Sequence, residues 1–133
     1  MNREMNPLAA LVVGEETLAD QELADALMPY VRFTEEAQLL LEPAFENLHS
    51  KEKVLCVLLA ARALNALGKR PTSELRSKEI IELAGMADGT VHSTVKRLKE
   101  SRFIKKGGQG GWEVPSHALR KVVDALDQSK EES

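Results

Sequence analysis

Hydrophobic and polar positions recur along this chain in steps that mostly fit helices. The clearest helical segment is residues 50–67, where apolar side chains dominate from Val54 onward. Ser50 is suited to cap the start of this helix, and Gly68 is suited to the left-handed position after its end. A helix with so few polar positions is predicted to be buried on most sides.

Two further helical segments follow closely in the chain. The first is predicted over Ser77–Ala84 and is capped by its serine, and Gly85 supplies a left-handed turn residue after it. The second is predicted over residues 88–101 and is capped by Asp88. Its apolar residues recur at steps of four and three, which places them on one inward face: Val91, Val95 and Leu98.

Residues 103–114 predict a β-hairpin, which we call the glycine hairpin. A five-residue loop with four glycines is flanked by two short segments that contain aromatic and β-branched residues. These segments are Phe103–Lys106 and Trp112–Val114. This loop, residues 107–111, is called the glycine loop. Upstream, Glu74–Arg76 is expected to form a short edge strand.

The pattern is less regular before residue 50. Residues 17–28 predict a helix. Residues 30–41 fit either a hairpin, which we favour, or an amphipathic helix that begins at Thr34. Residues 1–16, which include the apolar run Leu8–Val13, fit a strand, a helical turn or a tail.

A helix and a polar tail are predicted at the C-terminal end of the chain. Ser116 is suited to cap a helix over His117–Leu126. The apolar stripe of this helix consists of Leu119, Val122, Val123 and Leu126. Residues 127–133 are polar and are expected to fray.

The composition supports a small protein that is mainly α with a small β-hairpin. Of 133 residues, 43% are apolar but only 4% are aromatic, so the core must consist mostly of aliphatic side chains. Such a composition favours helices that pack on helices. The predicted organisation is an N-terminal extension over residues 1–49, a folded domain over residues 50–126 and a polar tail over residues 127–133.

Two further features predict a cytoplasmic protein. No apolar run approaches the roughly 20 residues that a membrane-spanning helix needs, and the N-terminal residues lack the pattern of a secretory signal. The single cysteine, Cys56, cannot form a disulfide within the chain, which fits a reducing compartment.

The net charge of −3 hides a strong asymmetry along the chain. Residues 1–49 contain ten acidic side chains against two arginines, whereas residues 89–106 contain six cationic side chains against one glutamate. Charges act on a partner within a Debye length of about 8–10 Å, so the local charge matters more than the sum over the chain. A local basic segment therefore still indicates a site for nucleic acid.

The predicted helix over residues 88–101 has the residue types that a DNA-reading helix needs. Small or polar side chains in its first half would let the backbone approach the bases, and cations further along would bind phosphates. Arg97 suits a base contact best, because its planar guanidinium matches guanine. The candidate DNA-binding residues on this helix are Thr90, His92, Ser93, Lys96, Arg97 and Lys99. The alternative is a solvated basic face on an ordinary helical domain.

The glycine hairpin is the second candidate DNA contact. Lys105 and Lys106 precede the glycine loop, and Gln109 is its single residue with a side chain. A loop with so few side chains can lie along a phosphate backbone or in a minor groove. The alternative is a plain β-turn, which would not require so many glycines. Trp112 is expected to anchor the hairpin on the core.

Little in the sequence supports catalysis, so no catalytic residue, metal ligand or cofactor is predicted. The three histidines are not spaced as metal ligands, and there is no cysteine pair. Cys56 lies in the most apolar segment, where a cysteine is usually an inert core residue. No Gly-Lys-Ser/Thr sequence follows the glycine loop, which excludes a phosphate-binding P-loop.

These segments together resemble the winged helix-turn-helix superfamily of bacterial and archaeal transcription regulators. With the flanking helices, the resemblance covers residues 50–126. It departs from the superfamily at Ser101-Arg102, where a glycine often ends the second helix. The residues that carry the resemblance are Lys78-Glu79-Ile80, Leu83-Ala84-Gly85-Met86, Asp88–Leu98 and Phe103-Ile104.

The resemblance implies a function for the two candidate segments. Residues 88–101 would be the recognition helix in the major groove, and residues 103–114 would be the wing on the DNA backbone or minor groove. We therefore expect a transcription regulator that binds double-stranded DNA. Because one winged helix covers only a short half-site, we expect a homodimer, with residues 1–49 and the last helix as candidate dimer surfaces. The alternative is a protein-interaction module within a larger complex, which the acidic N-terminal part fits.

Overall fold

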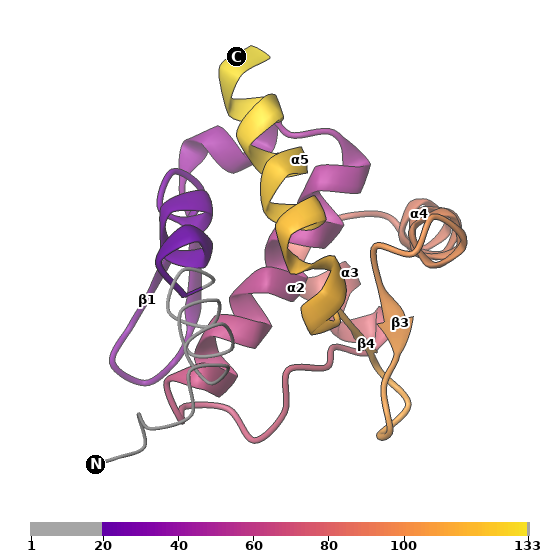
Figure 1. Cartoon of the computed structure of the whole chain (residues 1–133), viewed down its shortest axis with the longest axis horizontal. Helices are drawn as coiled ribbons and strands as arrows, with labels where there is room; N and C mark the ends of the chain where they lie inside the picture. The colour runs from indigo at the N-terminus through magenta and orange to yellow at the C-terminus, as the bar shows by residue number, and fades with distance from the viewer. Residues whose placement is uncertain (1–19, 133) are drawn as a thin grey trace, which may run out of the picture.

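The structure is a computed structural model that describes residues 20–132 of the chain, and it is mainly helical with two small antiparallel hairpins (Figure 1). The predicted fold class is confirmed. Among residues 20–132, no helix combines the length and apolar character that would let it cross a membrane. The predictions for residues 1–16 lie outside the described residues.

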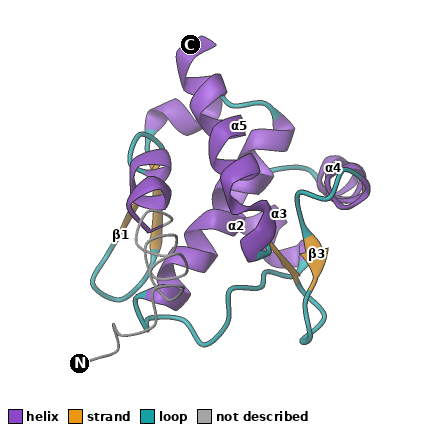
Figure 2. Cartoon of the chain, viewed as in Figure 1, coloured by secondary structure: helices purple, strands orange, loops and turns teal. Residues whose placement is uncertain are grey.

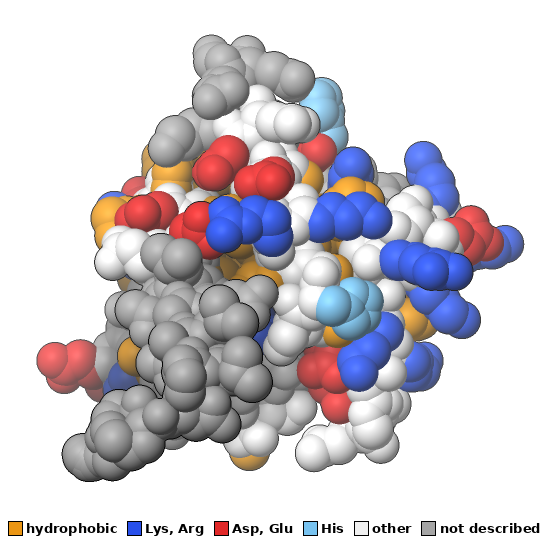
Figure 3. Space-filling model, in the orientation of Figure 1, with side chains coloured by type: hydrophobic (Ala, Val, Ile, Leu, Met, Phe, Trp, Pro, Cys, Tyr) orange, Lys and Arg blue, Asp and Glu red, His pale blue; other side chains and the backbone are white. Residues whose placement is uncertain are grey.

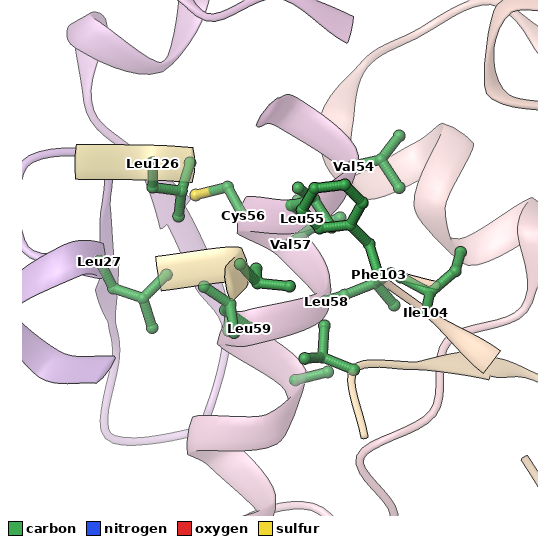
Figure 4. Close-up of a cluster of buried hydrophobic side chains, with 14 of the residues drawn as sticks. Leu27, Val54, Leu55, Cys56, Val57, Leu58, Leu59, Phe103, Ile104 and Leu126 are labelled. Carbon is green, nitrogen blue, oxygen red and sulfur yellow. The ribbon is translucent and has the colours of Figure 1, made fainter. Parts of the chain in front are cut away.

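The central element is helix α2, Ser50–Ala66, whose residues from Val54 to Ala61 are all buried. Three helices pack against it: α3, Ser77–Ala84; α4, Asp88–Glu100; and α5, Leu119–Glu132. Figure 2 shows this helical framework with the strands at its edges. Figure 4 shows side chains from α2 that meet Phe103, Ile104 and Leu126 in one core. Burial on most sides of α2 is therefore confirmed.

The segment before α2 forms a helix over residues 20–27, then a hairpin. Strand β1, Val31–Phe33, pairs antiparallel with β2, Leu39–Leu41, and Val31 lies opposite Leu41. The favoured hairpin alternative for residues 30–41 is thus confirmed. A short 3₁₀ helix, η2, Pro43–Asn47, connects the hairpin to α2.

Residues 20–48 share the core of the helices that follow. The buried side chains that this segment adds to the core are Leu23, Ala26, Leu27, Tyr30, Val31, Phe45 and Leu48. Each fully buried aliphatic or aromatic side chain contributes about 1.5–3 kcal/mol relative to exposure. The N-terminal segment is therefore part of the packed structure from residue 20 onward.

Three of the predicted helix caps are wrong by one residue. His49, Arg76 and Ala87 are the N-cap residues, and the expected caps are the first helical residues. No cap side chain bonds to these helix starts; instead the Arg76 N–H donates to Glu79 Oε1 at 2.9 Å. The left-handed glycines are confirmed, with φ of 74° at Gly68 and 66° at Gly85.

The C-terminal helix is longer than predicted. The predicted cap Ser116 is instead the first residue of a 3₁₀ turn, η3, Ser116–Ala118, whose N-cap is Pro115. Helix α5 then continues to Glu132, through residues expected to be a frayed tail. The prediction failed because residues 127–132 contain no glycine or proline and are mostly tolerated in helices. The stripe that was expected as a dimer surface is buried within the chain: Leu119, Val122, Val123 and Leu126.

Candidate nucleic-acid interface

A tight turn joins α3 to α4 and sets the orientation of α4 relative to the core. The Gly85 N–H and the Met86 N–H both donate to the Ile81 carbonyl, at 3.0 and 3.2 Å, which closes α3. Gly85 adopts the left-handed conformation that this closure requires. Ile80 and Ala84 of α3 are buried beside α2. The turn therefore delivers the chain directly to the start of α4.

The inward face of α4 is the predicted one. Val91, Val95 and Leu98 are all buried. Thr94 is also buried, with 4% of its surface exposed, although its polar character gave no indication of burial. Since this face is fixed on the core, the remaining residues of α4 must face solvent.

The outward face of α4 contains all six predicted DNA-binding residues of that helix, and each of them is exposed. Gly89, Ser93 and Lys96 follow one another at steps of four and three, on the side opposite the buried face. Glu100 continues this row, a position that sequence reasoning had not used. The residues of the outward face are Gly89, Thr90, His92, Ser93, Lys96, Arg97, Lys99 and Glu100.

Few side chains of the outward face are used within the molecule. Within residues 20–132, the side chains of Lys96, Arg97 and Lys99 make no hydrogen bond or ion pair. The Ser93 hydroxyl donates to the Thr90 carbonyl of its own helix at 3.2 Å. A methyl group at Gly89 would meet no atom within 4 Å, so internal packing does not require a glycine there.

The C-terminal end of α4 departs from the common glycine pattern, as the sequence indicated. Arg102 has a φ of 65°, which is the left-handed conformation that glycine adopts without cost. The Phe103 N–H donates to the Leu98 carbonyl at 2.9 Å, and the Arg102 N–H donates to the Lys99 carbonyl at 3.0 Å. The chain therefore forms a usual helix ending with an arginine in the glycine position.

Two lysines from other helices lie beside this end of α4, and sequence reasoning missed both. The ammonium groups of Lys51 and Lys121 lie 4.7 and 4.4 Å from the centre of the Phe103 ring. Lys121 Nζ also donates to the Ser101 carbonyl at 2.7 Å. They extend the basic surface of α4 toward α2 and α5. Because the lysines are far from α4 in the sequence, no local signal predicted them.

The glycine hairpin lies next to α4 on the same side of the molecule (Figure 1). Strand β3, Lys105–Lys106, pairs with β4, Trp112–Glu113. The predicted edge strand exists as a single bridge, in which Leu75 and Trp112 exchange two backbone hydrogen bonds of 2.9 and 2.7 Å. Trp112 is partly buried against the core, as expected for an anchor.

The predicted contacts of the hairpin are exposed, but not all are free of internal contacts. Lys105, Lys106 and Gln109 are exposed. Lys106 Nζ lies 4.5 Å from the centre of the Trp112 ring. Arg76, which sequence reasoning had not assigned to the interface, donates from Nη2 to the Gln109 carbonyl at 3.1 Å. The hairpin thus adds cations beside α4, some held by internal contacts.

The interpretation that a turn would not require so many glycines was wrong for most of the glycine loop. Gly110 has a φ of 87°, which favours glycine. A Cβ at Gly107 or Gly111 would lie 2.1 or 2.9 Å from atoms of the buried Glu74 side chain. Only Gly108 combines a normal φ with open space around a Cβ. Packing or backbone conformation therefore explains why three of the four loop positions are glycine.

The charge asymmetry of the sequence becomes an asymmetry of the surface. Figure 3 shows Lys and Arg side chains gathered on the side where α4 and the hairpin lie, and acidic side chains mainly elsewhere. Residues 20–48 contain seven acidic side chains and one arginine. A phosphate backbone at α4 would thus meet mainly cations within a Debye length of about 8–10 Å.

Metal ligands and the single cysteine are the other groups that could carry chemistry. Residues 20–132 contain no group of three His, Cys, Asp or Glu side chains placed to hold a metal ion. Burial raises the pKa of the Cys56 thiol to about 12, which makes a thiolate scarce at neutral pH.

No protein-family model, no curated protein and no solved structure matches this chain. The outward face of α4 and the glycine hairpin beside it are the features of the chain that indicate a function.

Proposed function

We propose that this chain binds double-stranded DNA in the manner of a winged helix-turn-helix protein and regulates transcription. The observation that carries this proposal is the set of three cations on the outward face of α4. Lys96, Arg97 and Lys99 are exposed and have no partner among residues 20–132. Cations that are not engaged by acidic side chains of the protein are available to phosphates.

The order of residues along α4 supports insertion into a major groove. Open space at Gly89 lets the start of the helix approach the base edges, and Thr90 and Ser93 are small enough not to prevent it. His92 would donate to a base or a phosphate from one flank. Lys96 and Lys99 would bind phosphates, and Arg97 would bind either a guanine or a phosphate.

In this proposal the glycine hairpin acts as the wing. Lys105 and Lys106 stand on β3 beside α4, and Gln109 is at the tip of the hairpin. These side chains would contact the DNA backbone next to the groove that α4 occupies. Contacts of this kind set the register of the protein on DNA rather than its sequence preference.

A homodimer remains part of the proposal, but with a revised surface. The stripe of α5 is buried, so it leaves no apolar face for a second copy. Met28 and Leu67 are instead 56% and 62% exposed, and both line an apolar groove of about 410 Å³ between the helix of residues 20–27 and the end of α2. If the groove is the dimer surface, Leu67→Glu should change the native mass of the protein from that of a dimer to that of a monomer.

The same groove supports the second candidate function, a protein-interaction module. The elements around the groove include the acidic segment of residues 20–48. A complementary partner would therefore place apolar side chains in the groove and basic side chains beside the acidic segment. The two functions predict different responses to salt and to DNA. Binding through the groove would be driven by apolar contacts and would leave α4 exposed.

A salt titration of DNA binding separates the two functions. The probes are the DNA that flanks the protein's own coding region and a shuffled duplex of equal length. Specific binding should favour the flanking DNA, and log affinity should fall linearly with log salt with a slope of about −4 to −6 for five or six phosphate contacts. If neither duplex binds at about 50 mM salt, the DNA proposal fails, and the interaction module becomes the better account.

A further inference from the structure

Glu74 places a buried carboxylate inside the glycine hairpin. Only 9% of its surface is exposed. Its Oε1 accepts hydrogen bonds from the Gly111 N–H at 2.9 Å and from the Gln109 N–H at 3.2 Å. Its Oε2 also lies 3.2 Å from the Gln109 nitrogen. The carboxylate thus occupies the position on the inner side of the loop to which the two N–H groups point.

The ends of the glycine loop are shaped around this carboxylate. A Cβ at Gly107 would lie 2.1 Å from Glu74 Oε2, and a Cβ at Gly111 would lie 2.9 Å from Glu74 Cβ. Real side chains do not approach so closely. In contrast, Gly108 has open space around it. The glycines nearest Glu74 therefore admit an internal anion, which is a different role from close approach to DNA.

The backbone around Glu74 is fixed on both sides. Arg70 Nη2 donates to the Glu74 carbonyl at 2.8 Å, and the next residue, Leu75, exchanges two hydrogen bonds with Trp112. Arg76 then donates to the Gln109 carbonyl at 3.1 Å. Three successive residues of one segment thus hold the hairpin, and both the Glu74 carboxylate and the Arg76 guanidinium reach its tip.

Backbone N–H groups that converge in a turn form a concave site for an anion. In a DNA-binding hairpin that anion could be a phosphate, but here a carboxylate of the same chain is bound. The N–H groups of Gln109 and Gly111 are consequently not available to DNA while Glu74 is in place. DNA would then meet mainly the side chains of the hairpin.

We propose that Glu74 is the positioning residue of the wing. It fills the anion site of the glycine loop, so that the wing contacts DNA through the side chains of Lys105, Lys106 and Gln109 and not through the N–H groups of Gln109 and Gly111. This inference rests on the proposed DNA-binding function for its second half only. The first half, that Glu74 orders the loop, concerns the free protein and can be tested without DNA.

The test compares Glu74→Ala with Glu113→Ala. Glu113 is a matched control, because it lies on the same hairpin and its removal changes the charge equally, but its carboxylate accepts from the Ser73 hydroxyl at 2.9 Å instead of from the loop. The first readout is amide hydrogen exchange of Gln109 and Gly111 in the free protein. Glu74→Ala should speed exchange at both amides by about tenfold or more, and Glu113→Ala should leave it unchanged.

The second readout is the salt dependence of DNA binding. With a disordered wing, Glu74→Ala should weaken binding by about tenfold and make the log–log slope shallower by about two, because the contacts of Lys105 and Lys106 are lost. Glu113→Ala should bind as well as the natural chain or better. Glu74→Gln retains one carbonyl acceptor and should fall between the natural chain and Glu74→Ala.

Two results would overturn the inference. One is unchanged exchange at Gln109 and Gly111 in Glu74→Ala. The other is tighter DNA binding in Glu74→Ala than in Glu113→Ala, which would mean that the vacated N–H groups take a phosphate. If Glu74→Ala does not fold, Gly107→Ala decides by the same readouts, since its methyl group displaces the carboxylate. If the natural chain binds no DNA, the proposed function fails while the exchange experiment still tests the ordering role.

Discussion

The outward face of α4 and the glycine loop both contain small residues beside cations, yet the molecule uses them differently. At Gly89 a side chain would meet open space, and the nearby cations of α4 have no internal partner among residues 20–132. At Gly107 and Gly111 a side chain would collide with Glu74. A small residue thus indicates a binding surface only where the protein's own packing does not explain it.

The largest expected effect concerns the cations of α4. Lys96→Ala combined with Arg97→Ala should lower DNA affinity about a hundredfold or more at about 100 mM salt, because each cation neutralises a phosphate or binds a base. Both side chains are exposed and make no hydrogen bond or ion pair within residues 20–132, so the free energy of unfolding should change by less than about 0.5 kcal/mol. Fluorescence anisotropy with labelled DNA measures the affinity.

The control for this double variant is Lys69→Ala, which removes an exposed cation beside the hairpin of residues 31–41. It should change DNA affinity less than about twofold, because it is not part of the candidate interface. Equal losses for the control and the double variant would mean that only overall charge matters, and α4 would lose its special role.

Alanine at two glycines would test the comparison itself. Gly111→Ala should destabilise the fold by about 1–3 kcal/mol, since its Cβ would lie 2.9 Å from Glu74 Cβ and 3.1 Å from the Leu75 carbonyl carbon. Gly89→Ala should leave the fold unchanged or stabilise it by up to about 1 kcal/mol, because alanine favours helix. Its DNA affinity should nevertheless fall, by about tenfold, because the methyl group keeps α4 from the bases.

Thermal unfolding and anisotropy, applied to both variants, give the two readouts. If Gly89→Ala were the destabilised protein, or if it bound DNA as tightly as the natural chain, Gly89 would not have the role in DNA binding that distinguishes it from Gly111.

A smaller effect is expected at the end of α4. Arg102→Gly should raise stability by about 0.5–1 kcal/mol, and the melting temperature by roughly 2–5 °C, because glycine adopts the left-handed φ of 65° without strain. Arg102→Ala is the control, since it removes the charge but keeps a side chain in the same conformation. Equal melting temperatures for the two variants would show that backbone strain at residue 102 is negligible.

A further prediction concerns the buried helix α2, against which α4 packs. The pKa of Cys56 rises from 9.0 to about 12 through burial, so the folded protein holds its proton longer than the unfolded chain. This contribution to stability is complete below about pH 9 and is lost as the pH rises toward 12. At pH 8 the thiol should resist a thiol reagent until the protein unfolds, whereas rapid labelling of the folded protein would contradict a closed core.

The alkaline loss of stability can be measured by urea unfolding at pH 8 and at pH 10.5. Cys56→Ala should lose less stability between these values than the natural chain. Tyr30 remains in both proteins, but its pKa is raised by burial and then by the nearby Cys56 charge, so it cancels from the difference only in part.

Local spacing predicted the elements that local interactions determine. The face of α4, the burial of α2 and the left-handed glycines at positions 68 and 85 follow from periodicity and from backbone sterics. The hairpin over residues 30–41 was the favoured alternative, and its β-prone runs support that choice.

Features that depend on contacts between distant residues were not predicted. Glu74 accepts hydrogen bonds from Gln109 and Gly111, which lie 35 and 37 residues further along the chain. No spacing rule could therefore reveal why residues 107 and 111 are glycines. Likewise, the stripe of α5 indicated an apolar face, but the sequence did not show that α2 covers it. The end of α5 was missed because a polar helix and a polar tail have the same composition.

Chemical-shift mapping on a DNA duplex tests the central claim most directly. Titration of the isotope-labelled protein with the flanking DNA should shift or broaden the amide signals of Gly89, Ser93 and Lys96 on α4, together with Lys105 on the hairpin. Signals from the groove around Met28 and Leu67 should stay in place. Shifts confined to that groove, with unmoved signals along α4, would contradict the account and favour a protein-interaction module.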